Sequence, residues 1–113
     1  MSVDPTMDLI YKSLQGLSAR QRATADNIAN SETPGFKATK VDFEASLRNA
    51  VGAGDPDKAT FSTAKSTEAN GANDNNVRMD NETVTAIDTN LKYQTMIEAM
   101  NAKFRLLKTA MGA

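Results

Sequence analysis

Apolar side chains recur at alternating spacings of three and four residues at both ends of this chain, and this pattern restricts how it can fold. The N-terminal stripe is formed by Met7, Ile10, Leu14, Leu17, Gln21, Thr24 and Ile28. The C-terminal stripe is formed by Ala86, Asn90, Tyr93, Ile97, Met100, Phe104, Leu107 and Met111, and it is widened by Val84, Ile87 and Leu91. Such heptads are typical of long helices that pack along one face. We expect helices over about 6–29 and 81–111.

Single residues refine these two helices. Pro5 suits the first turn of the N-terminal helix, and Asp80 is the expected N-cap of the C-terminal one. Gly16, with Ser13 and Ala23, forms a strip of small side chains, which either admits a close second helix or is simply tolerated. Asn90 either fixes the register of the helix pair or meets solvent at the edge of the stripe.

The segment between the helices is polar. Residues 48–79 contain four large apolar side chains, Val51, Phe61, Val77 and Met79, so this segment can bury little. We expect it to be irregular and mobile in the monomer, with a possible short strand near Phe61 that has no evident partner. The predicted fold is therefore mainly α, with two long terminal heptad helices forming a coiled-coil-like hairpin joined by a largely irregular polar segment.

We divide this single structural unit into four parts. They are the N-terminal helix (1–30), a turn motif with a short connection (31–47), a flexible polar linker (48–79) and the C-terminal helix (80–113). The chain has 113 residues, which suits one modest domain. Neither a cleaved signal nor a membrane span is evident in the sequence.

Composition argues against several functional classes. The net charge is −1, without a basic block, so nucleic-acid binding is not expected. The chain has no cysteine and no histidine, so thiolate chemistry and histidine acid–base catalysis are excluded. The acidic stretch from Asp74 fails the calcium-loop pattern, because Met79 and Thr85 replace its glycine and glutamate. We expect a protein that is not an enzyme and has no metal, cofactor or small-molecule substrate.

The most specific motif follows the N-terminal helix. Asn30 can end this helix in a left-handed conformation, and Pro34-Gly35 fits the centre of a type II turn with positive φ at the glycine. Phe36 can then anchor the chain against a helix. The motif residues are Asn27, Asn30, Thr33, Pro34, Gly35, Phe36 and Lys37.

This arrangement, N-I-A-N-x-x-T-P-G-[FY]-K at the end of a heptad helix, resembles the N-terminal motif of flagellar axial rod and hook-family proteins. Phe36 stands where tyrosine is common in that family. The run from Asn76 to Glu82 and the ending from Lys103 to Met111 are similar to those of its short proximal rod members. Hook and distal rod proteins carry added β domains, for which this chain has no room.

The resemblance implies a structural subunit of the basal-body rod that spans the periplasm, exported by the flagellar type III apparatus without a cleaved signal peptide. It implies self-association through the terminal helices and contacts with other rod proteins (FlgC, FlgF), the adaptor FliE and the inner-membrane ring. The candidate packing and assembly residues are Ile10, Leu14, Leu17, Ile28, Ile87, Leu91, Tyr93, Ile97, Met100, Phe104 and Leu107.

A soluble helical-hairpin adaptor or secretion chaperone is the alternative. It explains the heptads and the near-neutral charge but not the turn motif at this position. A chaperone should be a folded dimer, whereas a rod subunit should be weakly folded alone and assemble at high concentration.

Overall fold

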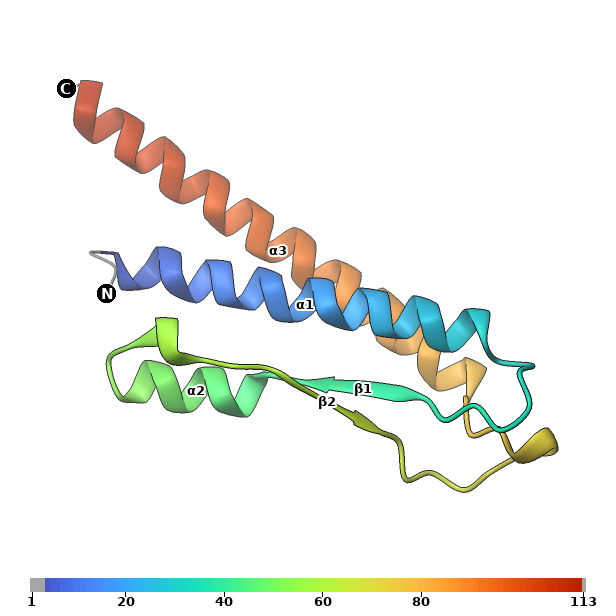
Figure 1. Cartoon of the computed structure of the whole chain (residues 1–113). Helices are drawn as coiled ribbons and strands as arrows, with labels where there is room; N and C mark the ends of the chain where they lie inside the picture. Colours follow the sequence, from blue (N-terminus) through green and yellow to red (C-terminus); the bar gives the residue numbers. More distant parts are fainter. Residues whose placement is uncertain (1–3, 113) are drawn as a thin grey trace.

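The computed structural model describes residues 4–112 and shows an elongated, predominantly helical molecule with principal extents of 62 × 25 × 14 Å (Figure 1). The long helices are α1 (Pro5–Ala29) and α3 (Met79–Gly112). Between them lie β1 (Thr39–Asp42), α2 (Glu44–Gly52), the 3-10 turn η1 (Pro56–Lys58), β2 (Ser62–Lys65) and the 3-10 turn η2 (Ala72–Asp74). The predicted fold class and the two terminal helices are confirmed.

The two long helices run antiparallel, so the beginning of α1 and the end of α3 lie at the same end of the molecule (Figure 1). Asp4 caps α1, because its carboxylate accepts a hydrogen bond from the Met7 amide at 3.3 Å. Asp4 also pairs with Lys103 of α3 at 3.4 Å. At the other end, Asn27 of α1 donates to Glu82 of α3 at 2.9 Å. These contacts fix the relative position of the helices along their length.

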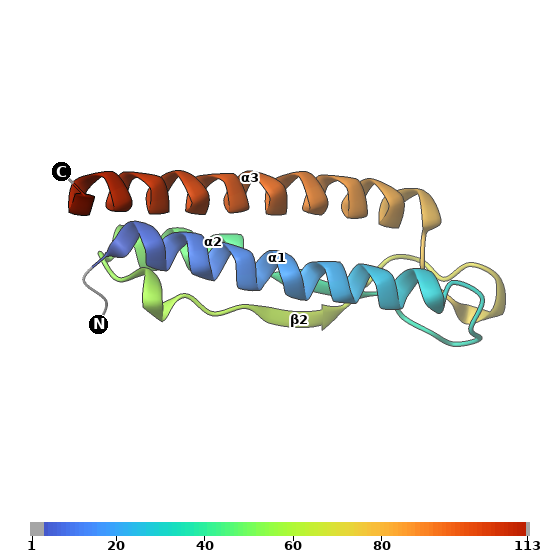
Figure 2. The same cartoon turned by 90° about the horizontal axis from the view of Figure 1, so that it is seen from above.

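A two-stranded sheet covers the other side of α1 and is called the hairpin below, although α2 and η1 lie between its strands. β1 and β2 pair antiparallel, with Thr39 opposite Lys65 and Asp42 opposite Ser62. Figure 2 shows α3 along one side of α1 and β2 along the other. The strand expected near Phe61 thus exists, and its partner is β1, which the sequence did not reveal. The polar middle also contains α2, which begins within the expected short connection.

The core is small and lies where α1, β1 and α3 meet. Its buried members are Leu17, Ala19, Val41 and Phe43, with Ala23, Leu47, Tyr93 and Met96 packed against them. Gly16 contributes by its missing side chain, because a Cβ there would lie 2.5 Å from the Phe43 ring. The small strip on α1 therefore admits an aromatic ring rather than a second helix, and Gly16 is not merely tolerated.

Two local expectations need correction. Asn30 ends α1 with φ −105°, not in the left-handed conformation, because its amide still bonds back to the Asp26 and Asn27 carbonyls. Asp80 lies inside the first turn of α3, which begins at Met79, so it is not the N-cap. Of the two alternatives for Asn90, exposure to solvent is the one found, whereas its neighbour Thr89 is fully buried. In residues 4–112, no helix is long and apolar enough to cross a membrane.

Candidate assembly interface

The turn motif forms a rigid loop at one end of the molecule. The Phe36 amide donates to the Thr33 carbonyl at 3.3 Å across Pro34 and Gly35, and Gly35 has φ +74°, as the type II turn requires. The Gly35 amide bonds to the carbonyl of Asn73 at 2.7 Å. Thr33, Pro34 and Gly35 are nevertheless exposed. The loop is therefore held by its backbone and presents its side chains outward.

Two asparagines before α3 hold this loop in place. The Asn75 side chain donates to the carbonyls of Asn30 and Thr33 at 2.9 and 2.8 Å. The Asn76 carboxamide accepts from the Ala38 amide at 2.7 Å and donates to the Ser66 carbonyl at 3.0 Å. Both residues are buried. The sequence shows only a polar stretch here, and it did not indicate that these two side chains would bind backbone groups distant along the chain.

Asn27 links three elements. Its side chain is 1 % exposed, accepts from the Thr39 amide at 2.9 Å and donates to the Thr39 carbonyl at 2.9 Å. It also donates to the Glu82 carboxylate. A carboxamide suits this position because it pairs with both polar groups of one backbone residue. Asn27 therefore joins α1 to β1 and to the start of α3.

Phe36 and Lys37 contact β2 and the loop that precedes α3. The half-buried Phe36 ring lies under the Lys65 ammonium of β2, 5.4 Å from the ring centroid. The Lys37 ammonium donates to the Asn70 side chain at 2.6 Å and to the Asp74 carbonyl. Its ion pair with the Asp74 carboxylate is 3.5 Å long. The motif thus fastens to β2 and to the loop that precedes α3.

An ion pair that the sequence did not reveal connects α1 to α2. The Arg20 guanidinium binds the Glu44 carboxylate in two-pronged fashion at 2.6 and 2.7 Å and donates to the Val41 carbonyl at 2.7 Å. It also stacks over the Phe43 ring at 4.8 Å. Hydrogen bonding to Arg20 lowers the pKa of Glu44 to about 2. The same bond raises the pKa of Arg20.

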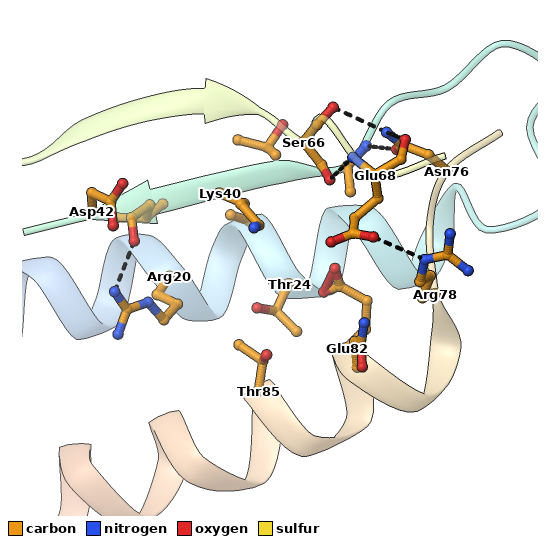
Figure 3. Close-up of a pocket in the computed structure, with 15 residues that line it drawn as sticks. Arg20, Thr24, Lys40, Asp42, Ser66, Glu68, Asn76, Arg78, Glu82 and Thr85 are labelled. Carbon is orange, nitrogen blue, oxygen red and sulfur yellow. Dashed lines mark hydrogen bonds and ion pairs between the residues drawn. The ribbon is translucent and has the colours of Figure 1, made fainter. Parts of the chain in front are cut away.

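A polar pocket of about 280 Å³ lies between α1, the hairpin and the start of α3 (Figure 3). Glu82 and Thr85 enter it from α3, Thr24 from α1, and Arg78 pairs there with Glu68 at 3.6 Å. Burial raises the pKa of Glu82, against the opposing effect of the Asn27 hydrogen bond. Within residues 4–112, no group of three acidic, histidine or cysteine side chains is placed to hold a metal ion.

The structure divides the predicted assembly residues into three groups by exposure. Ile10 and Leu17 are buried in the monomer. A second group is half-buried on the two long helices: Leu14, Ile28, Tyr93, Ile97 and Met100. The third group remains exposed on α3: Ile87, Leu91, Phe104 and Leu107. A short chain that leaves this much apolar surface on one helix is suited to packing against other chains.

Comparison with known proteins defines the class. The flagella basal body rod protein family matches residues 12–37, which cover most of α1 and the whole turn motif. The rod protein FlgB of Bacillus subtilis is 30% identical over 119 residues, covering 94% of this chain and 92% of that protein. FlgB of Aeromonas hydrophila is 30% identical over 128 residues, covering 99% and 97%. FlgB of Borrelia hermsii is 52% identical over 46 residues, which span 41% of this chain and 34% of that protein.

The fold and these matches define a flagellar axial structural protein. More specifically, the chain belongs to the FlgB family of flagellar basal-body rod proteins and is a structural subunit of that rod. It is located in the flagellar basal body and assembles there with other flagellar components.

Proposed function

We propose that this subunit assembles through α1 and α3, which pack against the corresponding helices of neighbouring subunits to form the axial drive shaft. The exposed apolar face of α3 is the observation that supports this. Phe104, Leu106, Leu107 and Met111 all remain accessible on the last turns of α3, although a soluble monomer would gain by burying them.

The neighbours in this proposal are copies of the same chain and the rod proteins FlgC and FlgF, with the adaptor FliE and the inner-membrane ring at the proximal end. We further propose that the subunit reaches the periplasm through the flagellar type III export apparatus, without a cleaved signal peptide. Membership of the FlgB family supports this choice of partners, and the exposed helix faces offer surfaces for them. A soluble adaptor or secretion chaperone has no support from the family comparison.

The test changes exposed positions on α3, so that folding of the subunit is preserved. Phe104→Asp and Leu107→Asp should stop incorporation into basal bodies, because each places a charge in a seam that becomes buried on assembly. Asn101→Asp, an exposed polar position on the same helix, is the matched control and should assemble. Basal bodies would be isolated and imaged, and circular dichroism would check helicity of the purified chains. Normal rods from both apolar variants would refute assembly through this part of α3.

Two half-buried positions, one on each long helix, provide a second part of this test. Leu14→Asp and Ile97→Asp should also abolish assembly, but here through the half-buried seam between α1 and α3. The Leu14→Asp and Ile97→Asp chains should therefore also have lower helicity when free in solution. The changes at Phe104 and Leu107 should not lower the helicity.

A further inference from the structure

A ridge of apolar side chains runs along the outer face of the first half of α3. Val84, Ile87 and Leu91 are 66%, 59% and 59% exposed and follow one another at spacings of three and four residues. They therefore lie on one face of the helix. Thr89, which is 0% exposed, marks the opposite face against the rest of the fold. The ridge has acidic surroundings, with Asp80 and Asp88 on its flank.

A groove of about 370 Å³ runs along the outer face of α1. Five of its lining residues come from α1, and the other two are Phe61, directly before β2, and Tyr93 of α3. The lining residues are Tyr11, Leu14, Gln15, Ser18, Arg22, Phe61 and Tyr93. Tyr11 and Phe61 remain about half exposed, although both are large enough to contribute substantially to a packed interface.

Arg22 gives the groove a positive charge. Its guanidinium donates to the Ser18 hydroxyl at 3.1 Å, and none of the ion pairs found within residues 4–112 involves it. On the ridge, Asp88 pairs with Lys92 at 2.9 Å, but both side chains are more than half exposed. Such a surface pair contributes little and is readily exchanged for another. The groove and the ridge are thus complementary in charge as well as in apolar character.

One chain cannot bring its own ridge into its own groove. The Asn27–Glu82 and Asp4–Lys103 contacts fix α3 against α1, and the ridge points away from that contact. Between those two contacts, residues 84–91 of α3 lie beside about residues 17–25 of α1. The ridge therefore lies at nearly the same height along the molecule as the groove. Two parallel copies placed side by side, with a small axial shift, can bring one surface to the other.

We propose that the ridge Val84–Ile87–Leu91 of one copy packs into the α1 groove of the adjacent copy, with Arg22 facing Asp88 of that neighbour. This rests on the proposed function and adds to it the pair of surfaces that meet. Since the two surfaces differ, the contact is heterologous, and each copy keeps one ridge and one groove free for the next. Repetition of this contact produces an arc or helical turn of subunits, as a rod requires.

Cross-linking tests this contact directly, because the chain has no cysteine. Gln15→Cys places a thiol in the groove, and Ile87→Cys places one on the ridge. Cells would co-express the two single-cysteine chains, and basal bodies would be isolated and mildly oxidised. We expect a disulfide between the two different variants and none in cells that express either variant alone. Thr67→Cys, exposed in the loop after β2 and outside the groove lining, replaces Gln15→Cys as the control and should not cross-link to Ile87→Cys.

Charge reversal provides the second readout. Arg22→Glu or Asp88→Arg, added separately to the cysteine pair, should lower the cross-link yield roughly five- to tenfold, because like charges then face each other. Both reversals together should restore most of it. A dimer formed by Ile87→Cys alone would indicate a symmetric contact and overturn the proposal.

The outcomes also separate this inference from the proposed function. Basal bodies that form normally but show no groove–ridge cross-link would overturn the inference alone, because assembly through the helices would stand with other surfaces in contact. Cross-linking of Ile87→Cys to a different rod protein in place of Gln15→Cys would likewise overturn it. Failure of the unsubstituted chain to enter basal bodies would instead contradict the proposed function.

Discussion

Gly16 lies against the face of Phe43, and a Cβ added at Gly16 would be 2.5, 2.6 and 2.7 Å from three atoms of that ring. Phe43 is buried and joins β1 to α2, so it has little room to withdraw. The absence of a side chain in the middle of α1 therefore determines how closely the hairpin packs on the helix.

Gly16→Ala should destabilise the subunit, although alanine favours a helix over glycine by about 1 kcal/mol. Overpacking of a core typically costs about 1–3 kcal/mol. Contacts this short place the site at the upper end of that range, so we expect a net loss of about 1–2 kcal/mol in the free energy of unfolding, measured by urea denaturation. Adding Phe43→Leu should reduce the cost of the alanine. A more stable single variant would show that the ring can move aside freely.

Gly35 tests backbone conformation without any packing effect, because nothing lies within 4 Å of the Cβ position. At φ +74°, Gly35→Val should cost about 2 kcal/mol or more and impair motility. Gly35→Asn should be milder, because asparagine tolerates positive φ. Motility assays with basal-body imaging compare the two. Equal effects would mean that the loop acts through something other than its turn geometry, such as recognition during export.

Two substitutions of Phe36 test the contribution of its aromatic ring separately from that of the backbone turn. Phe36→Tyr should be nearly neutral, because it keeps the ring under the Lys65 ammonium. Phe36→Ala removes that contact and should impair assembly in the same assays.

Asn27→Ala should destabilise the subunit by about 1–3 kcal/mol, because the Thr39 amide and carbonyl lose the partner that satisfies them in a partly buried site. Asn30→Ala is the matched control, since its side-chain hydrogen bonds to Asp26 are exposed, and its loss should cost little. Thermal unfolding of both variants gives the comparison. Similar melting temperatures for both would argue against Asn27 as the link between α1, β1 and α3.

Two carboxylates should give opposite dependences of stability on pH. The pKa of Glu44 is lowered from 4.5 to about 2, so its pairing with Arg20 stabilises the fold above pH 4.5, and this contribution is lost as the pH falls from 4.5 to 2. Because the Glu44 side chain is 44% exposed, solvent screening limits the effect to about 1 kcal/mol or less. Glu44→Gln should therefore flatten the decline of stability in that range.

The pKa of Glu82 is raised, so this residue favours the fold while protonated, and that contribution is lost as the pH rises from 4.5 through the raised value. Glu82→Gln should remove this loss and leave the Glu44-dependent decline intact. Urea denaturation between pH 2 and 7 checks both variants. If Glu82→Gln lowers stability at pH 7, the carboxylate's bond to Asn27 outweighs its burial cost.

The sequence by itself determined the two long helices, because a heptad stripe is a local pattern that specifies a helix and its apolar face. It also determined the turn, since Pro34 restricts one backbone angle and Gly35 permits the positive φ observed beside it. The family motif lies in the same stretch, so class and function followed from local signals.

Only the tertiary structure decided which polar residues matter and which apolar residues stay free. Asn75 and Asn76 act on backbone groups that are distant in sequence, and Arg20 meets Glu44 only because β1 folds back along α1. The heptad pattern likewise placed Ile87 and Leu91 beside Tyr93 on one broad face. The splitting of that face into a half-buried seam and an exposed ridge depends on how α3 is rotated against α1, which side-chain packing sets and local spacing does not.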